Sequence, residues 1–129
     1  MPHRTRVLVV DDNRDMVYSL LALLETEGYI AKGIYSAIYS ESTIVADVRD
    51  FNPDIIIMDI AMPGRTGWDA ARQVRQDRAG KRPLLIATSG QYTKGADRVR
   101  ADLSGLDYFV IKPCDPKALL KLVASYTAK

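Results

Sequence analysis

The stretch that decides the fold runs from residue 55 to residue 67 and reads Ile55-Ile56-Ile57-Met58-Asp59-Ile60-Ala61-Met62-Pro63-Gly64-Arg65-Thr66-Gly67. Its first four residues form an unbroken apolar run, which is typical of a strand with both faces of its sheet covered. Asp59 stands where that run stops. A Met-Pro-Gly turn follows, and the residues from Thr66 to Asp69 indicate a helix start with a capping box. Asp59 is therefore expected at the carboxyl end of a buried strand, where open α/β sheets bind ligands.

Composition places the chain among single globular domains. Its 129 residues suffice for one core, and 47% hydrophobic with 26% charged residues is ordinary for such a protein. The formal net charge of +2 is too small to indicate nucleic acid by itself. The single cysteine, Cys114, cannot form an internal disulfide, and no apolar run approaches the ~20 residues of a membrane span. We expect one cytoplasmic domain over residues 1–129, with a core of about residues 5–127, no membrane segment and no effector domain.

Short apolar runs alternate with segments of helical periodicity along the whole chain. The runs predict five strands, over Arg6–Val10, Tyr29–Ile34, Asp54–Met58, Leu84–Thr88 and Tyr108–Ile111. The periodic segments predict five helices, at Arg14–Glu27, Ser40–Asp50, Trp68–Asp77, Ala96–Leu103 and from Pro116 onward. This alternation indicates βαβ units and a parallel sheet with right-handed crossovers, and hence an α/β fold.

Specific residues mark the ends and faces of these helices. In the first helix, residues recur at helical spacing and Gly28 ends the helix. The recurring residues are Met16, Leu20, Leu23, Leu24 and Glu27. In the second helix, Ile44, Val45 and Val48 should face inward, and Asn52-Pro53 should end the helix. In the third helix, Ala71 and Val74 should face inward. In the last helix, Asp115-Pro116 forms the start, and the inward positions are Leu119, Leu122, Val123 and Tyr126.

Functional groups stand at the ends of four of the five predicted strands. They are Asp11 and Asp12, Asp59, Thr88, and Lys112. The carboxyl ends of parallel strands meet at one edge, so these side chains should converge. Each also has an ordinary interpretation: Asp11, Asp12 or Asn13 could cap the first helix, Asp59 could be a turn former, and Thr88 and Lys112 could be plain strand and loop residues. Together they indicate a site.

The residue types in this set favour phosphoryl chemistry. Clustered carboxylates repel one another unless a cation lies among them, and an all-oxygen ligand set suits Mg²⁺. A carboxylate beside Mg²⁺ can act as the nucleophile toward a phosphoryl group, while Lys112 and Thr88 could stabilise its oxygens. His3 lies in the amino-terminal arm, away from the set. Ser-His-Asp, Cys-His and zinc chemistries are therefore unsupported.

The sequence resembles a response regulator receiver domain (CheY-like) over essentially its whole length. The pieces that carry the resemblance are Val7-Leu8-Val9-Val10-Asp11-Asp12-Asn13, Asp59-Ile60-Ala61-Met62-Pro63-Gly64, Ala87-Thr88-Ser89-Gly90 and Lys112-Pro113. In character it is similar to the receivers of hybrid histidine kinases and their stand-alone relatives. The resemblance implies a flavodoxin-like (βα)5 three-layer sandwich with a parallel sheet in the order 2-1-3-4-5.

The resemblance also implies a role for each site residue. Asp59 would accept a phosphoryl group from the phosphohistidine of a histidine kinase or histidine phosphotransfer protein. Mg²⁺ would be bound by Asp12, Asp59 and the backbone carbonyl of Ala61, with Asp11 acting through water. Thr88 and Lys112 would contact the phosphoryl group, and Phe109 would be the switching aromatic residue coupled to Thr88. Such a domain is no enzyme in the usual sense, because it catalyses only its own phosphorylation and dephosphorylation, and it signals to a downstream protein.

Other functions compete with this one. A phosphorylation-independent docking module with the same fold would be expected to lack Asp59, Lys112 or one of the acidic pair, yet all are present. A phosphatase with an aspartyl nucleophile would need a second Asp where this chain has Ala61. The basic residues of the third helix and its flanks favour a solvated face over direct nucleic-acid binding. Charged residues between Asp97 and Asp102 could support a homodimer or partner binding.

Overall fold

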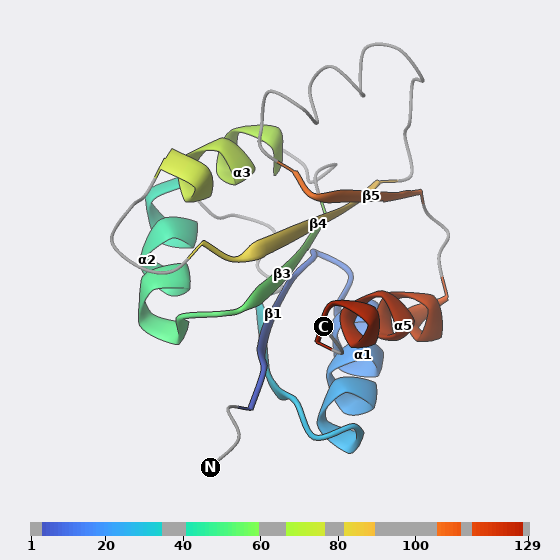
Figure 1. Cartoon of the computed structure of the whole chain (residues 1–129). Helices are drawn as coiled ribbons and strands as arrows, with labels where there is room; N and C mark the ends of the chain where they lie inside the picture. The colour runs from blue at the N-terminus through green and yellow to red at the C-terminus, as the bar shows by residue number, and fades with distance from the viewer. Residues whose placement is uncertain are drawn as a thin grey trace.

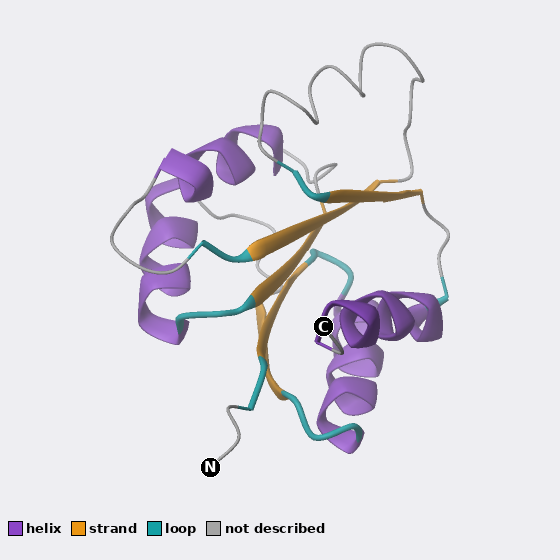
Figure 2. Cartoon of the chain, in the orientation of Figure 1, coloured by secondary structure: helices purple, strands orange, loops and turns teal. Residues whose placement is uncertain are grey.

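The computed structural model describes residues 4–34, 41–59, 67–76, 82–89, 106–111 and 115–127, with the side chains at 41–43, 67–70 and 89 excepted. Strands and helices alternate within these residues as far as residue 89; the next described element is again a strand, and a helix follows it (Figure 2). The elements are β1 (Arg6–Val10), α1 (Arg14–Thr26), β2 (Ile30–Ile34), α2 (Glu41–Phe51), β3 (Ile55–Asp59), α3 (Gly67–Gln76), β4 (Leu84–Ser89), β5 (Tyr108–Ile111) and α5 (Pro116–Thr127). The predicted helix at Ala96–Leu103 and the capping box at Thr66 lie outside the described residues.

The described strands form one parallel sheet in the order β2-β1-β3-β4-β5, which confirms the predicted α/β fold and its strand order. Helices α1 and α5 lie on one face of the sheet, and α2 and α3 lie on the other (Figure 1). The result is the three-layer sandwich of the flavodoxin-like architecture. Because every strand runs in the same direction, the carboxyl ends of β1, β3, β4 and β5 come together at one edge.

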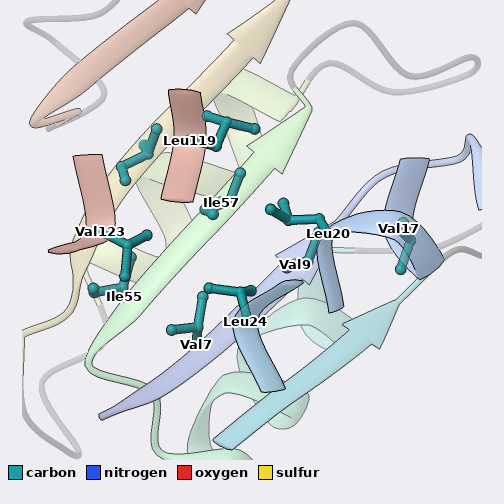
Figure 3. Close-up of a cluster of buried hydrophobic side chains, with 10 residues drawn as sticks. Val7, Val9, Val17, Leu20, Leu24, Ile55, Ile57, Leu119 and Val123 are labelled. Carbon is teal, nitrogen blue, oxygen red and sulfur yellow. The ribbon is translucent and has the colours of Figure 1, made fainter. Parts of the chain in front are cut away.

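The central strands bury side chains on both faces, as their unbroken apolar runs predict. Residues 7 to 10 of β1 and all five residues of β3 are buried. On the face covered by α1 and α5, the alternate residues of β1 and β3 meet the inner sides of the two helices (Figure 3): Val7, Val9, Ile55, Ile57, Val17, Leu20, Leu24, Leu119 and Val123. The opposite face packs against α2 and α3 through a second core cluster that includes Leu8, Met58, Ile44, Ala71 and Val74.

Helix α1 presents a different inner side from the one its periodicity suggests. Its buried residues are Val17, Leu20 and Leu24. Of the other predicted positions, Met16 is half-buried and packs against the core, whereas Val17 was not named in the prediction. The reason lies in β2, where a Cβ added at Gly33 would come within 2.5 Å of the Val17 Cγ1 atom. Because β2 has no side chain at that position, α1 lies close enough for Val17 to pack on the strand.

The ends of α1 and α2 follow from two residues with positive φ. Gly28 has a φ of 93°, a conformation that suits glycine, and α1 ends two residues before it, at Thr26, where the prediction was Glu27. Asn52, with a φ of 54°, follows the last residue of α2, and asparagine tolerates this left-handed region better than most residues. Phe51 is buried at this end, and the Arg6 guanidinium lies over its ring at 4.4 Å from the centroid.

The last helix matches its prediction except at its carboxyl end. Leu119 and Val123 are buried in the core and Leu122 packs against it, but Tyr126 is 39% exposed. The inner stripe of α5 thus stops one turn before the helix does. None of the helices in the described part of the chain combines the length and the apolar character that crossing a membrane requires.

Candidate functional site

The turn between β1 and α1 holds two aspartates at the carboxyl edge of the sheet. The backbone N–H of Asp11 donates to the carbonyl of Ile34 at 3.0 Å, which attaches the turn to β2. The Asp11 carboxylate accepts the backbone N–H of Asn13 at 2.9 Å. Asn13 is the N-cap of α1, since its side chain accepts the backbone N–H of Met16 at 3.2 Å. Of the three candidates for this cap, the helix uses Asn13, and Asp11 and Asp12 remain next to the strand end.

Asp59 and Thr88 lie side by side at the same edge. Asp59 is the last residue of β3, whereas the predicted strand ended one residue earlier, at Met58. Asp59 pairs in register with Thr88 of β4. Asp59 is 5% exposed and Thr88 is fully buried. The Thr88 hydroxyl has no hydrogen-bond partner among the described residues. A buried hydroxyl without a partner costs free energy, so its presence here points to a ligand with an acceptor atom.

Three carboxylates converge at this edge. Oxygens of Asp11, Asp12 and Asp59 all lie within 4.8 Å of one another. Burial, a side-chain hydrogen bond with Asp11, and the charges of Asp11 and Asp59 raise the pKa of Asp12 above its ordinary value. These charges disfavour one another in the absence of a cation, and carboxylate oxygens are the ligands that Mg²⁺ takes in proteins. The donor set therefore fits Mg²⁺ in both charge and chemistry.

The remaining predicted site residues are only partly described. Phe109 pairs with Ala87, the residue before Thr88, and its half-buried side chain packs against Ala87, as does that of Leu106. Ala61 and Lys112 lie outside the described residues, so their roles stay predictions. In the sequence, Ala61 comes two residues after Asp59, and Lys112 directly follows the last residue of β5.

Sequence reasoning assigned no role to the two aspartates that stand at the other edge of the sheet. Asp54 and Asp107 each directly precede a strand, and each bonds the backbone of the neighbouring strand. The signal that could have found them is an acidic residue placed immediately before an apolar run, where it can accept backbone N–H groups. The same placement is also typical of an ordinary strand boundary, so it does not by itself indicate a role.

Known proteins match this chain over most of its length. The model of the response regulator receiver domain matches residues 7–124. Protein PilH of Pseudomonas aeruginosa is 32% identical over 126 residues, covering 95% of this chain and 98% of PilH. The DNA-binding response regulator MtrA of Mycolicibacterium smegmatis is 33% identical over 93% of this chain, which spans only 49% of MtrA. The CAI-1 autoinducer sensor kinase/phosphatase CqsS of Vibrio cholerae is 31% identical, and the chain covers 18% of it.

Solved structures share the fold. A CheY-like receiver domain protein from Methanospirillum hungatei superposes with a TM-score of 0.81 at 24% identity, over 96% of this chain and 94% of that one. Chemotaxis protein CheY4 of Vibrio cholerae gives 0.81 at 23% identity, over 95% and 98% of the two chains. From the family match over most of its residues and the similarity to PilH, the chain belongs to the response regulator receiver domains, the signalling domains of two-component phosphorelays.

Proposed function

We propose that this chain accepts a phosphoryl group on Asp59 in a Mg²⁺-dependent reaction and changes conformation in response. One observation carries the proposal: three converging carboxylates lie beside a buried hydroxyl without a partner among the described residues. The acidic cluster supports a cation, and the Thr88 hydroxyl supports an acceptor-rich group next to Asp59. A phosphoryl group on Asp59 in the presence of Mg²⁺ satisfies both requirements.

The reaction would be a displacement at phosphorus. A carboxylate oxygen of Asp59 attacks the phosphorus of a phosphohistidine, the P–N bond breaks, and the imidazole nitrogen leaves with the bonding electrons. The product on this chain is an acyl phosphate. When bound, Mg²⁺ supplies positive charge for the phosphoryl oxygens as their charge is redistributed. Asp11, Asp12 and Asp59 would hold the ion, together with the backbone carbonyl of Ala61.

Thr88 and Lys112 would act on the phosphoryl group itself. The Thr88 hydroxyl is oriented by a strand that pairs directly with the strand of Asp59, so it can donate to one phosphoryl oxygen without a large movement of the backbone. Lys112 would neutralise another oxygen as a point charge. Phe109 packs against Ala87, next to Thr88, so its ring would change position when β4 shifts and would alter the surface of the domain.

Receiver domains are phosphorylated by histidine kinases or by phosphotransfer proteins, and we propose one of these as the donor to this chain. The downstream partner would be a protein that distinguishes the two states of the domain. The single cysteine of the chain supports a reducing compartment such as the cytoplasm. A self-catalysed loss of the phosphoryl group would return the domain to its resting state.

Fluorescence of Trp68 provides the test. This single tryptophan lies nine residues after Asp59, at the start of α3, and should respond to changes at the site. We expect a saturable response to Mg²⁺ and a second one to beryllium fluoride, a phosphoryl mimic, in the wild type. The Asp59→Asn variant should lose the beryllium fluoride response while keeping its circular dichroism spectrum. A flat response from a folded wild type would favour the phosphorylation-independent docking module.

A further inference from the structure

Two aspartates make the same pair of hydrogen bonds at the amino edge of the sheet, opposite the proposed site. Asp54, directly before β3, donates its backbone N–H to the carbonyl of Arg6 and accepts the backbone N–H of Arg6 on its carboxylate, both at 2.8 Å. Asp107, directly before β5, bonds Leu85 of β4 in the same way, at 2.9 and 2.8 Å. Each aspartate occupies both backbone groups of one residue in the neighbouring strand. Each therefore sets the register of its strand pair.

The Asp107 carboxylate is held in turn by α3. Arg75 places its Nη2 atom 2.5 Å from the Asp107 Oδ2 atom and donates from Nη1 to the carbonyl of Pro83 at 2.5 Å. The side chains of Arg75 and Asp107 are only 11% and 24% exposed. Burial lowers the pKa of the Arg75 guanidinium, while the charge of Asp107 acts in the opposite direction. One carboxylate thus joins α3, β4 and β5.

The two strands differ in how much they depend on these bonds. Strand β3 lies between β1 and β4 and buries all five of its residues, so its register is also fixed by two neighbours and by the core. Strand β5 has four residues and pairs with β4 alone among the described strands, and its first and last residues, Tyr108 and Ile111, are 41% and 53% exposed. A slip of one residue turns every side chain of a strand to the opposite face. For β5, apolar burial opposes such a slip only weakly.

We propose that Asp107, held by Arg75, is a positioning residue for phosphoryl recognition at the far end of β5. Its bonds to Leu85 hold the register in which Phe109 lies opposite Ala87 and Val110 lies opposite Thr88. In the sequence, Lys112 directly follows Ile111, the last residue of the strand. The inference rests on the proposed function, because it assigns the register of β5 to the phosphoryl step. The carboxylates that would bind Mg²⁺ belong to the turn after β1 and to β3. The register that Asp107 gives to β5 should therefore affect binding of the phosphoryl group and leave Mg²⁺ binding unchanged.

The experiment is a calorimetric titration with Mg²⁺ alone and then with beryllium fluoride in excess Mg²⁺. Asp107→Ala should raise the beryllium fluoride concentration at half-saturation on the order of tenfold, since small misplacements of binding groups have effects of this size or larger. Its Mg²⁺ affinity should match that of the wild type. The matched control is Asp54→Ala, which removes the equivalent pair of bonds from a strand that is fixed in other ways. A second control is Arg82→Gln, because the Arg82 side chain is 67% exposed and lies 3.7 Å from Asp107.

Arg75→Met keeps the inference testable if Asp107→Ala prevents folding because the half-buried Arg75 guanidinium loses this partner. It should shift the beryllium fluoride titration in the same direction by a smaller factor, because Asp107 retains its bonds to Leu85. Equal losses of Mg²⁺ and beryllium fluoride affinity in the Asp107 and Arg75 variants would overturn the proposal, as would an equal selective loss in Asp54→Ala. If Asp107→Ala and Arg75→Met bind as the wild type does, the positioning role is wrong while the proposed function stands. If the wild type itself does not bind beryllium fluoride, both fail.

Discussion

Replacing Thr88 by valine should stabilise the fold and at the same time abolish the response to a phosphoryl mimic. The two side chains have nearly the same shape and both favour strands, so the substitution changes little except the hydroxyl. In the structure that hydroxyl is fully buried and has no partner among the described residues. We therefore assign it the proposed role of donor to a phosphoryl oxygen.

The size of the effect follows from the burial. A buried hydroxyl without a partner costs about 1–3 kcal/mol in mutational data, and the valine methyl group removes that cost. We expect the Thr88→Val free energy of unfolding to rise by about 1–2 kcal/mol, with a melting temperature higher by roughly 4 °C per kcal/mol for a domain of this size. Thr88→Ser retains the hydroxyl and loses a buried methyl group, so its stability should fall by about 1 kcal/mol.

Urea unfolding in Mg²⁺-free buffer measures these stabilities, and beryllium fluoride titration in excess Mg²⁺ measures the response. We expect Thr88→Val to be the most stable, the wild type intermediate and Thr88→Ser the least stable. Only the wild type and Thr88→Ser should respond to beryllium fluoride. This opposition separates a functional hydroxyl from a structural one. A loss of stability in Thr88→Val would refute the reasoning, because it would mean that the hydroxyl is hydrogen-bonded in the resting protein.

Further predictions concern the packing of α1 and the acidic cluster. Gly33→Ala should lower the free energy of unfolding by about 1–3 kcal/mol, because its Cβ would lie 2.5 Å from the stiff Val17 side chain. Combined with Val17→Ala, it should cost less than the sum of the single variants, and strictly additive losses in urea unfolding would contradict that contact. The raised pKa of Asp12 means that the folded chain binds more protons than the unfolded chain between pH 3.8 and the raised value, so stability falls as the pH increases through that window. Asp12→Asn should remove this slope, raise the stability at pH 7 without Mg²⁺ and abolish stabilisation by Mg²⁺. An unchanged slope in a pH series of urea titrations would show that another group is responsible.

The sheet could be predicted from the sequence because its strands are short apolar runs between polar residues. The apolar run from Ile55 to Met58 indicates a strand covered on both faces, as in a parallel α/β sheet, which is why the edge that carries Asp59 was predictable. The strand order came from the resemblance to receiver domains and not from the apolar pattern. The boundaries of the described helices also came within one residue, since Gly28 and Asn52 end helices by local backbone geometry.

Side-chain directions were harder to predict, because they depend on contacts between distant elements. The inner side of α1 includes Val17 since Gly33 leaves room for it on β2, and no periodicity within α1 contains that information. Tyr126 has helical spacing with Leu119 but lies beyond the part of α5 that the core covers. The cap of α1 had three polar candidates in succession, and only the geometry of the turn selects Asn13.

For the site, the predicted convergence of Asp11, Asp12 and Asp59 follows from the parallel sheet alone, and the structure brings their oxygens together. The position of Thr88 follows from the same argument. The absence of a hydrogen-bond partner for its hydroxyl among the described residues could not be predicted, since it depends on every neighbour of that atom. The hydrogen bond between Asp107 and Arg75 escaped prediction for a similar reason, because the two residues are 32 positions apart in the sequence.

The central claim is that Asp59 is the phosphoryl acceptor, and chemical trapping tests it most directly. The protein is incubated with acetyl phosphate and Mg²⁺, reduced with borohydride to convert an aspartyl phosphate to homoserine, and digested for mass spectrometry. We predict homoserine at position 59 alone, in a reaction that stops when Mg²⁺ is chelated. Conversion at another aspartate, or none in a folded protein with Mg²⁺ present, would contradict the account.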